Sequence, residues 1–300
     1  MQSRNPILNN SSTFNGRAAS NYGHSSYAAG GSGYQGYGQS PMSTPSTDPS
    51  TWQYPSGPSV QERMTIDSVV SRTALTLFIV VATAAATWIF LPDGRSGGAY
   101  DPGAANYVPV AWIGGALVGA GLGLFLSFKR TVSPALVVLY CVAQGVFLGA
   151  VSEAFEQSFS SGDSAYSGIV AHAIAGTVGA FVATLAAYKF FDIRVTSTFR
   201  KWVTIVGMGF FAVTFFDFLL SIFHADLGFN GFGTLGLIAS FVGLGLGVLY
   251  LILDFDMVER GIAAGAPEQE SWRAAFALTA TLILIYVELL RILAIMRGSD

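Results

Sequence analysis

Charged residues are scarce in this chain. They make up 11% of its 300 residues, whereas hydrophobic residues make up 52%. A soluble domain carries roughly a quarter of its residues as charged side chains, so this chain lacks the charge needed to keep its surface in water. A surface that faces a lipid bilayer resolves the shortage. The net charge of −3 also argues against the basic surface that nucleic-acid binding requires.

The chain has only one cysteine, and the common catalytic motifs are missing. The single cysteine, Cys141, lies in an apolar run, which excludes a disulfide framework and a zinc site built on several thiolates. The sequence has no His-Glu-x-x-His motif and no Walker-type glycine loop. We therefore expect neither an enzymatic activity nor a bound cofactor or metal.

The first 60 or so residues lack any apolar run. They are rich in Ser, Gly, Tyr, Asn and Gln, with prolines at positions 41, 45, 49, 55 and 58. Such a segment cannot bury enough surface to offset the entropy of ordering it. It also lacks the basic start and apolar core of a signal peptide. The sequence predicts a disordered tail over residues 1–63 and a transmembrane domain over residues 64–300.

Seven long apolar segments follow this tail. Each offers about 20 mostly apolar residues, which is the helix length that crosses roughly 30 Å of hydrocarbon. None shows the strict alternation over about 10 residues that a membrane β-barrel strand requires. The sequence predicts an all-α bundle of seven transmembrane helices, over residues 73–91, 108–128, 134–155, 168–190, 202–223, 233–254 and 274–296.

Glycines recur at four-residue spacing in three of these segments. This spacing places them on one helix face and lets two backbones approach closely. We therefore expect a tightly packed bundle. The glycines are Gly115, Gly119 and Gly123, then Gly145 and Gly149, and finally Gly243 and Gly247.

Basic residues are distributed unevenly between the two ends of the predicted bundle. One end receives Arg63, Arg72, Lys129, Arg130, Lys189, Arg194, Arg200, Lys201, Arg260 and Arg273. The other end receives only Arg95 and Arg297. Because basic loops stay in the cytoplasm, we predict that the tail is cytoplasmic and that the C-terminus lies on the outer side. Arg291 and Arg297 leave an alternative, in which the last segment is re-entrant and the C-terminus is cytoplasmic.

Several polar residues lie inside the predicted spans, where charge is costly and calls for a reason. They are Gln144, Glu153, His172, Asp217, Asp254, Glu288 and Arg291. Asp217 has no cation within one helical turn, so it either faces the bundle interior or is protonated. Glu153 either serves a function or marks the membrane surface, and His172 is interpreted as a hydrogen-bonded residue of helix packing.

Asp254 directly follows an apolar run over residues 248–253. If the helix continues to Arg260, then Asp256 and Arg260 form a pair at i,i+4 spacing on the solvated surface. Asp254 has no such local partner. A carboxylate in apolar surroundings can change its charge when those surroundings change, which suits a gate or a proton sensor. The alternative is that Asp254 only marks the water boundary.

Three sequence features together carry a resemblance to a known family. They are Asp254-Phe255-Asp256-Met257-Val258, Ser133-Pro134 followed by Gln144-Gly145-Val146-Phe147-Leu148-Gly149, and Glu288-Leu289-Leu290-Arg291-Ile292-Leu293. Their order over about residues 64–297 resembles the Bax inhibitor-1/YccA family, also called transmembrane Bax inhibitor motif proteins, in its long actinobacterial form. The resemblance implies six helices around a central seventh helix, a place in a bacterial inner membrane and a pH-sensitive calcium leak.

The resemblance also implies a gate. In that family, two aspartates on the sixth and seventh spans share a proton and pair with a basic residue at the cytoplasmic end of the second span. Asp254 matches the first aspartate, and Lys129 or Arg130 matches the basic residue. Thr281 stands where the second aspartate is expected, and Gln144 stands where the family has an acidic residue in the third span. A single carboxylate would titrate without a like-charged neighbour.

Glu288 and Arg291 lie three residues apart on one face of the last segment, where they can neutralise each other. Glu288 also lies two turns beyond Thr281 on the same face, a rise of about 10 Å. That distance is too long for Glu288 to replace the missing aspartate directly.

Three functions follow from these features. The leading hypothesis is a cation leak that passes Ca²⁺, latched at its cytoplasmic end by Asp254 and either Lys129 or Arg130. The second is a regulator or interaction partner of a membrane-bound protease or a stress-response protein, with the long tail as its docking segment; some bacterial relatives are thought to modulate such a protease. The third, a proton-coupled transporter using Asp217 and Asp254, is disfavoured because the sequence shows no internal repeat.

Overall fold

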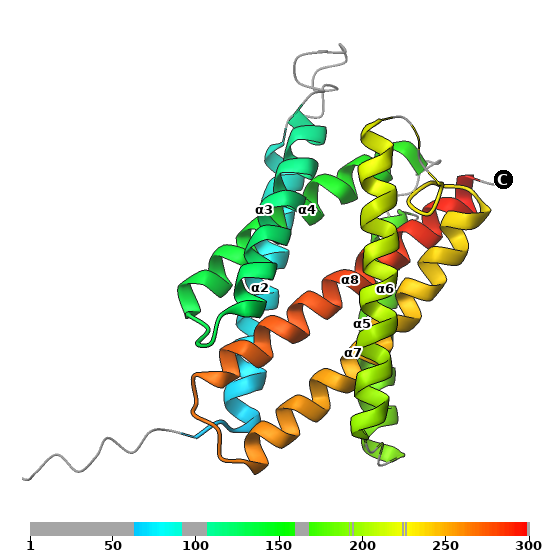
Figure 1. Cartoon of the computed structure of the whole chain (residues 1–300). Coiled ribbons are helices and arrows are strands. Elements are labelled where there is room, and N and C mark those ends of the chain that lie inside the picture. The colour runs from blue at the N-terminus through cyan, green and yellow to red at the C-terminus, as the bar shows by residue number, and fades with distance from the viewer. Residues whose placement is uncertain are drawn as a thin grey trace, which may run out of the picture. The chain divides into compact units, whose positions relative to one another are not determined.

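A computed structural model describes residues 63–91, 107–159, 168–191, 193, 195–223, 225 and 227–298. These residues form seven helices and no strand: α2 (Ile66–Phe90), α3 (Tyr107–Phe128), α4 (Pro134–Phe159), α5 (Ile169–Phe190), α6 (Ser197–Ile222), α7 (Thr234–Ala263) and α8 (Glu270–Gly298) (Figure 1). Every one of them is long and apolar enough to cross a membrane. The predicted all-α bundle of seven spans is confirmed, and the chain is a multi-pass membrane protein. The tail predicted over residues 1–63 lies outside the described residues, except for Arg63.

Three helices, α2, α6 and α8, begin at least four residues earlier than their apolar runs predicted, and side-chain caps account for the first two. Helix α2 begins at Ile66 because the side chain of Thr65 accepts a hydrogen bond from the Ser68 backbone, while the Ser68 hydroxyl accepts one from the Thr65 N–H. This reciprocal pair is a capping box. Helix α6 begins at Ser197 because the Thr196 side chain caps it in a similar way. Polar caps outside the hydrocarbon therefore set these helix ends, whereas apolar length marks only the membrane-embedded part.

Helix α7 ends later than predicted. It continues past Asp254 to Ala263, and the chain then turns through Gly265, whose φ of 65° is the left-handed conformation that glycine adopts without strain. The extra turns carry both Asp256 and Arg260, so the two residues lie on one helix with i,i+4 spacing.

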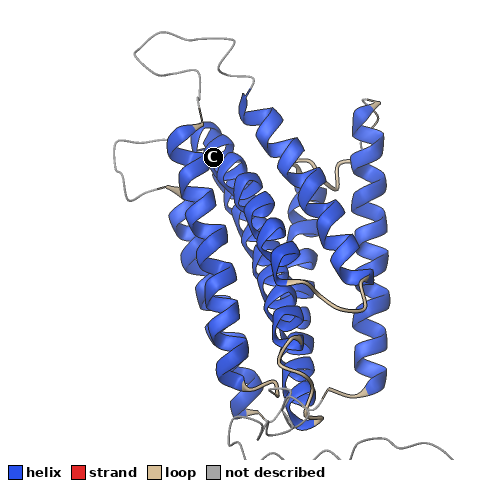
Figure 2. Cartoon of the chain, turned by 90° about the vertical axis from the view of Figure 1, so that its left-hand side faces the viewer, coloured by secondary structure: helices blue, strands red, loops and turns tan. Residues whose placement is uncertain are grey.

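Helix α8 is the centre of the bundle, as predicted. It contacts α2, α4, α5 and α7 (Figures 1 and 2). In its most apolar stretch 67% of the residues are buried, against 11% to 50% in the other six helices. Hydroxyl pairs join it to α2, with 2.7 Å between Ser68 Oγ and Ser271 Oγ and 2.8 Å between Thr76 Oγ1 and Thr279 Oγ1. Such hydrogen bonds between hydroxyls help to hold helices together in lipid.

Glycines bring α2 and α4 together, which confirms the packing role predicted for their four-residue spacing. A Cβ on Gly145 would lie 2.8 Å from the Val80 carbonyl oxygen, and one on Gly149 would lie 2.5 Å from that of Ala84. Both distances are shorter than van der Waals contact. The two backbones therefore approach as closely as they do only because these positions carry no side chain.

We predict that Gly149→Val destabilises the bundle by about 1–3 kcal/mol, the usual cost of overpacking. The new side chain would collide with the backbone of Ala84 and the side chain of Thr87, so α2 would have to move away from α4. The matched control is Gly121→Val on α3, because a Cβ there meets nothing within 4 Å. Thermal unfolding in detergent measures both, and equal melting temperatures for the two variants would contradict the close contact.

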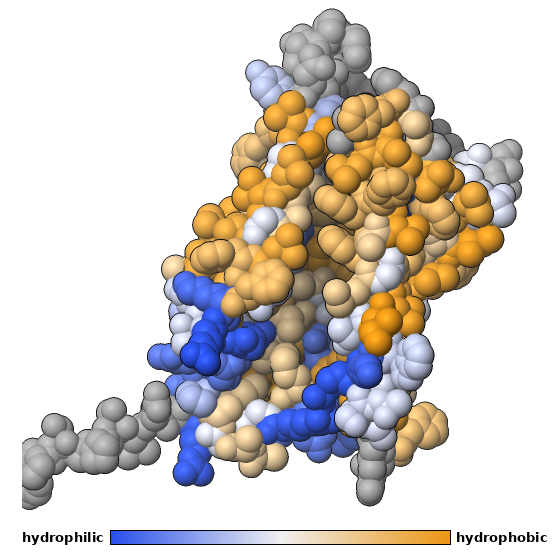
Figure 3. Space-filling model, in the orientation of Figure 1, coloured by the Kyte–Doolittle hydropathy of each residue, from blue (hydrophilic) through white to orange (hydrophobic). Residues whose placement is uncertain are grey.

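Hydrophilic residues gather toward one end of the bundle, as Figure 3 shows for one face. At this end the Arg72 guanidinium donates to the carboxylate of Glu268. Arg273 donates to the backbone carbonyls of Lys129 and Arg130. We call this the basic end; it comprises the N-terminal ends of α2, α4, α6 and α8 and the C-terminal ends of α3, α5 and α7. Its placement in the cytoplasm stays a prediction.

Candidate functional site

Asp254 faces α8 from the last third of α7. It is half-buried, and its carboxylate Oδ2 accepts a 2.7 Å hydrogen bond from the Thr281 hydroxyl. Thr281 itself is 8% exposed. The structure therefore places Thr281 opposite Asp254, at the position where the family resemblance expects a second aspartate. A hydroxyl can donate to a carboxylate and cannot titrate in its place.

Lys129 and Arg130 do not complete the expected latch in this structure. The Lys129 ammonium lies over the ring of Phe125, 5.6 Å from its centroid, and the two backbone carbonyls bind Arg273. Among the described residues, neither basic side chain forms an ion pair with Asp254. The reason is topological, because α3 packs against α4 and not against α7.

Asp256 is the carboxylate that binds arginine. Its Oδ2 accepts from Arg200 at 2.8 Å, and its Oδ1 accepts from Arg260 Nη2 at 2.8 Å and from Nε at 3.0 Å. The predicted i,i+4 pair of Asp256 and Arg260 is confirmed, but Asp256 is 7% exposed, so its placement on the solvated surface is wrong. Arg200 comes from α6 and covers the carboxylate, which the i,i+4 spacing of Asp256 and Arg260 could not reveal.

The basic end of α7 is thus held on two sides. Side chains two residues apart on an α-helix are rotated by about 200° around its axis, so Asp254 and Asp256 point in nearly opposite directions. Asp254 contacts α8 through Thr281, while Asp256 contacts α6 through Arg200. Arg260 also donates to the Val195 carbonyl just before α6. The sequence analysis did not identify Asp256 and Arg200 as site residues.

Asp217 lies near the opposite end of the bundle and is fully buried. Its carboxylate oxygens accept backbone N–H groups from Leu227 at 2.6 Å and Asn230 at 2.7 Å. The Asn230 side chain donates in turn to the Thr214 carbonyl. Asp217 therefore faces the interior, and it fixes the connection between α6 and α7 by hydrogen bonds from backbone donors.

Arg291 holds the same connection from α8. Its guanidinium donates to the carbonyl oxygens of Phe229 and Gly231. Glu288, one turn earlier on α8, is 7% exposed and lies over Gly243 of α7. Within the described ranges no direct ion pair joins Glu288 to Arg291, although the two charges attract each other along α8; the guanidinium itself binds the connection between α6 and α7.

The other polar residues predicted inside the spans lie apart from Asp254. The Gln144 side chain packs against Gly119 across the α3–α4 interface. His172 is exposed, and its ring nitrogen Nδ1 lies 2.9 Å from the Gly168 carbonyl oxygen one turn earlier. Glu153 is half-buried in the last two turns of α4.

Two buried aliphatic residues separate the polar groups along the α7–α8 seam. Glu288 lies against Gly243 on one side, and Asp254 binds Thr281 on the other. Between these contacts, Leu251 and Ile285 are both 0% exposed. The two carboxylates are thus divided by an apolar layer. No group of three or more His, Cys, Asp or Glu residues that could hold a metal occurs in the part of the chain that the structure describes.

Comparison with known proteins identifies a family for this chain. A search of curated proteins found no match. The model of a family described as "Bax inhibitor 1 like" matches residues 5–298. The match spans nearly the whole chain and includes the α7–α8 seam and both groups of polar contacts described above. The chain belongs to the Bax inhibitor 1 like family.

Proposed function

We propose that this protein is a pH-sensitive cation leak with Ca²⁺ as a permeant ion, and that Asp254 controls its opening. The observation that carries the proposal is the hydrogen bond between Asp254 and Thr281 across the α7–α8 seam. This carboxylate holds the central helix through a hydroxyl and without an arginine. Its protonation therefore changes the contact directly, with no ion pair to compensate.

The seam is closed in the conformation described here. Leu251 and Ile285 are fully buried between Asp254 and Glu288, and an ion cannot shed its water in such an apolar layer without a large cost in free energy. Ca²⁺ prefers carboxylate and carbonyl oxygens. We infer that Asp254 and Glu288 offer oxygen ligands on either side of this layer, and that α7 and α8 must separate before Ca²⁺ passes between them.

Protonation of Asp254 favours the open state in this scheme. A hydrogen bond to a charged acceptor contributes about 1.5–3 kcal/mol, and a neutral one about 0.5–1.5 kcal/mol. Loss of the charge therefore weakens the α7–α8 contact by about 1–2 kcal/mol. That difference changes a two-state equilibrium by a factor of roughly 5–30. The leak should increase as the pH falls.

Asp256 supplies the second half of the closed state. Its contacts with Arg200 and Arg260 hold α6 and α7 together at the basic end. We infer that this ion pair takes the latching role that the family resemblance gave to Lys129 or Arg130. In the predicted orientation the basic end faces the cytoplasm, so Asp254 would respond to cytoplasmic pH.

Calcium flux into proteoliposomes tests the proposal. The purified full chain is reconstituted around a calcium indicator, and uptake is followed at several pH values from 5 to 8. We expect uptake above that of protein-free liposomes, with a larger rate at the acidic end. Uptake indistinguishable from protein-free liposomes at every pH would contradict the leak. Binding of a membrane-bound protease through the tail stays a prediction from the sequence alone.

A further inference from the structure

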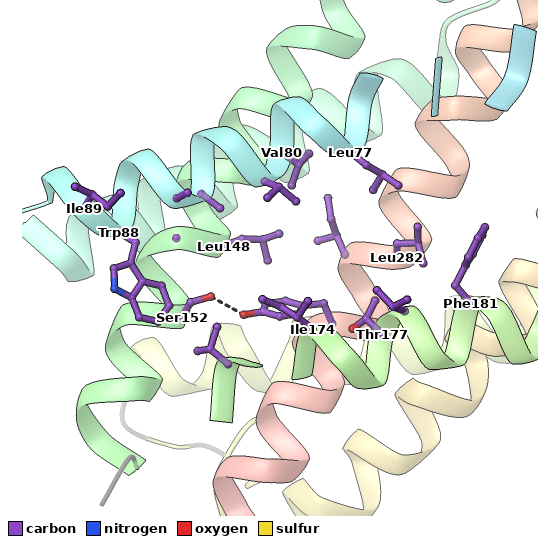
Figure 4. A pocket seen from close by; sticks show the side chains of 18 residues that line it. Leu77, Val80, Trp88, Ile89, Leu148, Ser152, Ile174, Thr177, Phe181 and Leu282 are labelled. Carbon is purple, nitrogen blue, oxygen red and sulfur yellow. Dashed lines mark hydrogen bonds between the residues drawn. The ribbon is translucent and has the colours of Figure 1, made fainter. Parts of the chain in front are cut away.

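A cavity of about 550 Å³ lies beside the central helix. Its walls come from α2 and α5, and its floor comes from α4 and α8 (Figure 4). Leu77 and Trp88 mark its two ends along α2, Ile174 and Phe181 line the α5 wall, and Leu282 and Tyr286 belong to the floor. Helices α2 and α5 both pack on α8, while no comparable packing joins α2 to α5 among the described residues. The cavity is thus a crevice whose mouth lies between two helices that face the bilayer.

The chemistry of the lining excludes ions and polar ligands. Eighteen residues line the crevice and none is charged. The only hydroxyls are those of Ser152, Thr177 and Tyr286, and each already has a partner. Ser152 and Tyr286 share a hydrogen bond of 2.6 Å, and Thr177 donates to the Ala173 carbonyl at 2.8 Å. An occupant therefore gains only from burying apolar surface, which suits a hydrocarbon chain.

The length of the crevice matches one leaflet of a bilayer. Its lining on α2 extends from Leu77 to Ile89, and 12 residues of helix rise about 18 Å. Half of a typical hydrocarbon core is about 15 Å thick. Trp88 and Ile89 lie in the last turn of α2, where a tryptophan commonly marks the membrane surface. The crevice thus runs from that surface to about the middle of the membrane.

We propose that this crevice binds one acyl chain of a bilayer lipid, taken from the leaflet at the end opposite the basic end. The chain enters between α2 and α5 and lies against Leu282 and Tyr286 of the central helix, while the headgroup stays outside near Trp88. No basic residue lines the site, so neutral and anionic phospholipids should bind alike. This site is separate from Asp254 and does not depend on the proposed leak.

Photocrosslinking tests the site when the label is located residue by residue on α8. Leu282 and Tyr286 are each 8% exposed and line the crevice, whereas Leu284 between them is half-buried and does not line it. The full chain is reconstituted with phosphatidylcholine carrying a diazirine on its acyl chain, irradiated, digested and sequenced by fragmentation. We expect label on Leu282 and Tyr286 in excess of label on Leu284. A phosphatidylglycerol probe should label them to the same extent.

Adjacent alanines provide the matched variants. Ala85 lines the crevice, whereas Ala86 is exposed on α2 and does not line it. Ala85→Phe should fill the crevice and reduce α8 labelling at least fivefold, and Ala86→Phe should leave it unchanged. Ile174→Phe from the α5 wall repeats the test, with exposed Ala175→Phe as its control.

Any of three results would overturn the proposal. One is the absence of α8 labelling in the wild type while lipid-facing helices are labelled. Another is α8 labelling that both filling variants leave unchanged, although their melting temperatures match those of their controls. A strong preference for the anionic probe would also contradict an acyl-chain site, because it would require a headgroup contact that the lining does not offer.

Discussion

Asp217→Asn is expected to destabilise the protein by about 3 kcal/mol or more. The fully buried carboxylate accepts two backbone N–H groups, one on each oxygen. An asparagine has the same shape but offers one acceptor oxygen and one NH₂ group, so at least one buried N–H would face another donor. Hydrogen bonds to charged groups contribute about 1.5–3 kcal/mol each, and an unsatisfied buried donor costs about 1–3 kcal/mol.

Thermal unfolding in detergent measures this loss. The control is Asp67→Asn, because Asp67 is exposed in the first turn of α2 and its charge there contributes only about 0.3–1 kcal/mol. If Asp217→Asn and Asp67→Asn melt at the same temperature, Asp217 does not fix the connection between α6 and α7. Asp217→Glu keeps the negative charge on a longer side chain. A loss of stability between those of the other two variants would support the geometry.

Asp256→Asn is expected to release α6 from α7 and to increase calcium leak severalfold. The carboxylate is 7% exposed and binds two arginines. Because the Arg200 and Arg260 side chains are 45% and 49% exposed, water can solvate them after the change. The cost should therefore fall below the 3–5 kcal/mol of a fully buried pair, at about 1–3 kcal/mol.

A double-mutant cycle separates the contact between α6 and α7 from general damage. Arg200→Gln, Asp256→Asn and the double variant are compared for melting temperature and for calcium flux. We expect the effects of the two single changes to overlap in part in the double variant, since both remove the contact between Arg200 and Asp256, while Asp256→Asn also weakens the contact with Arg260. Glu259→Gln serves as the control on the same helix. Glu259 is exposed, and the amide oxygen of the new glutamine can still accept the hydrogen bond from the Tyr188 hydroxyl. Full additivity would show that Arg200 and Asp256 act separately.

The sequence predicts the membrane-spanning helices well because the bilayer imposes their length and apolar character. It predicts their ends poorly, because those depend on local polar contacts such as the Thr65 and Ser68 capping box. The central position of α8 came only from the family resemblance. Glu288 and Arg291 inside this span are compatible with a helix shielded from lipid, but they do not place it at the centre.

The site shows a similar division. Asp254 can be singled out from sequence because it interrupts no helix and has no local partner. Its partner Thr281 lies 27 positions further along the chain, so the contact depends on the register of α7 against α8. Whether the basic residue of the latch is Arg200, or instead Lys129 or Arg130, depends on which helix packs beside α7. That neighbour is α6 rather than α3, and loop charges alone do not reveal it.

The pH dependence of calcium flux through Asp254→Asn tests the central claim most directly. Asparagine keeps the shape of the side chain and removes its charge, so it mimics the protonated aspartate. We predict that wild-type flux rises as the pH falls, whereas the variant has a flux at pH 8 near the wild-type acidic rate and responds little to pH. If the variant keeps the full wild-type pH dependence, Asp254 is not the proton-sensitive group of this protein.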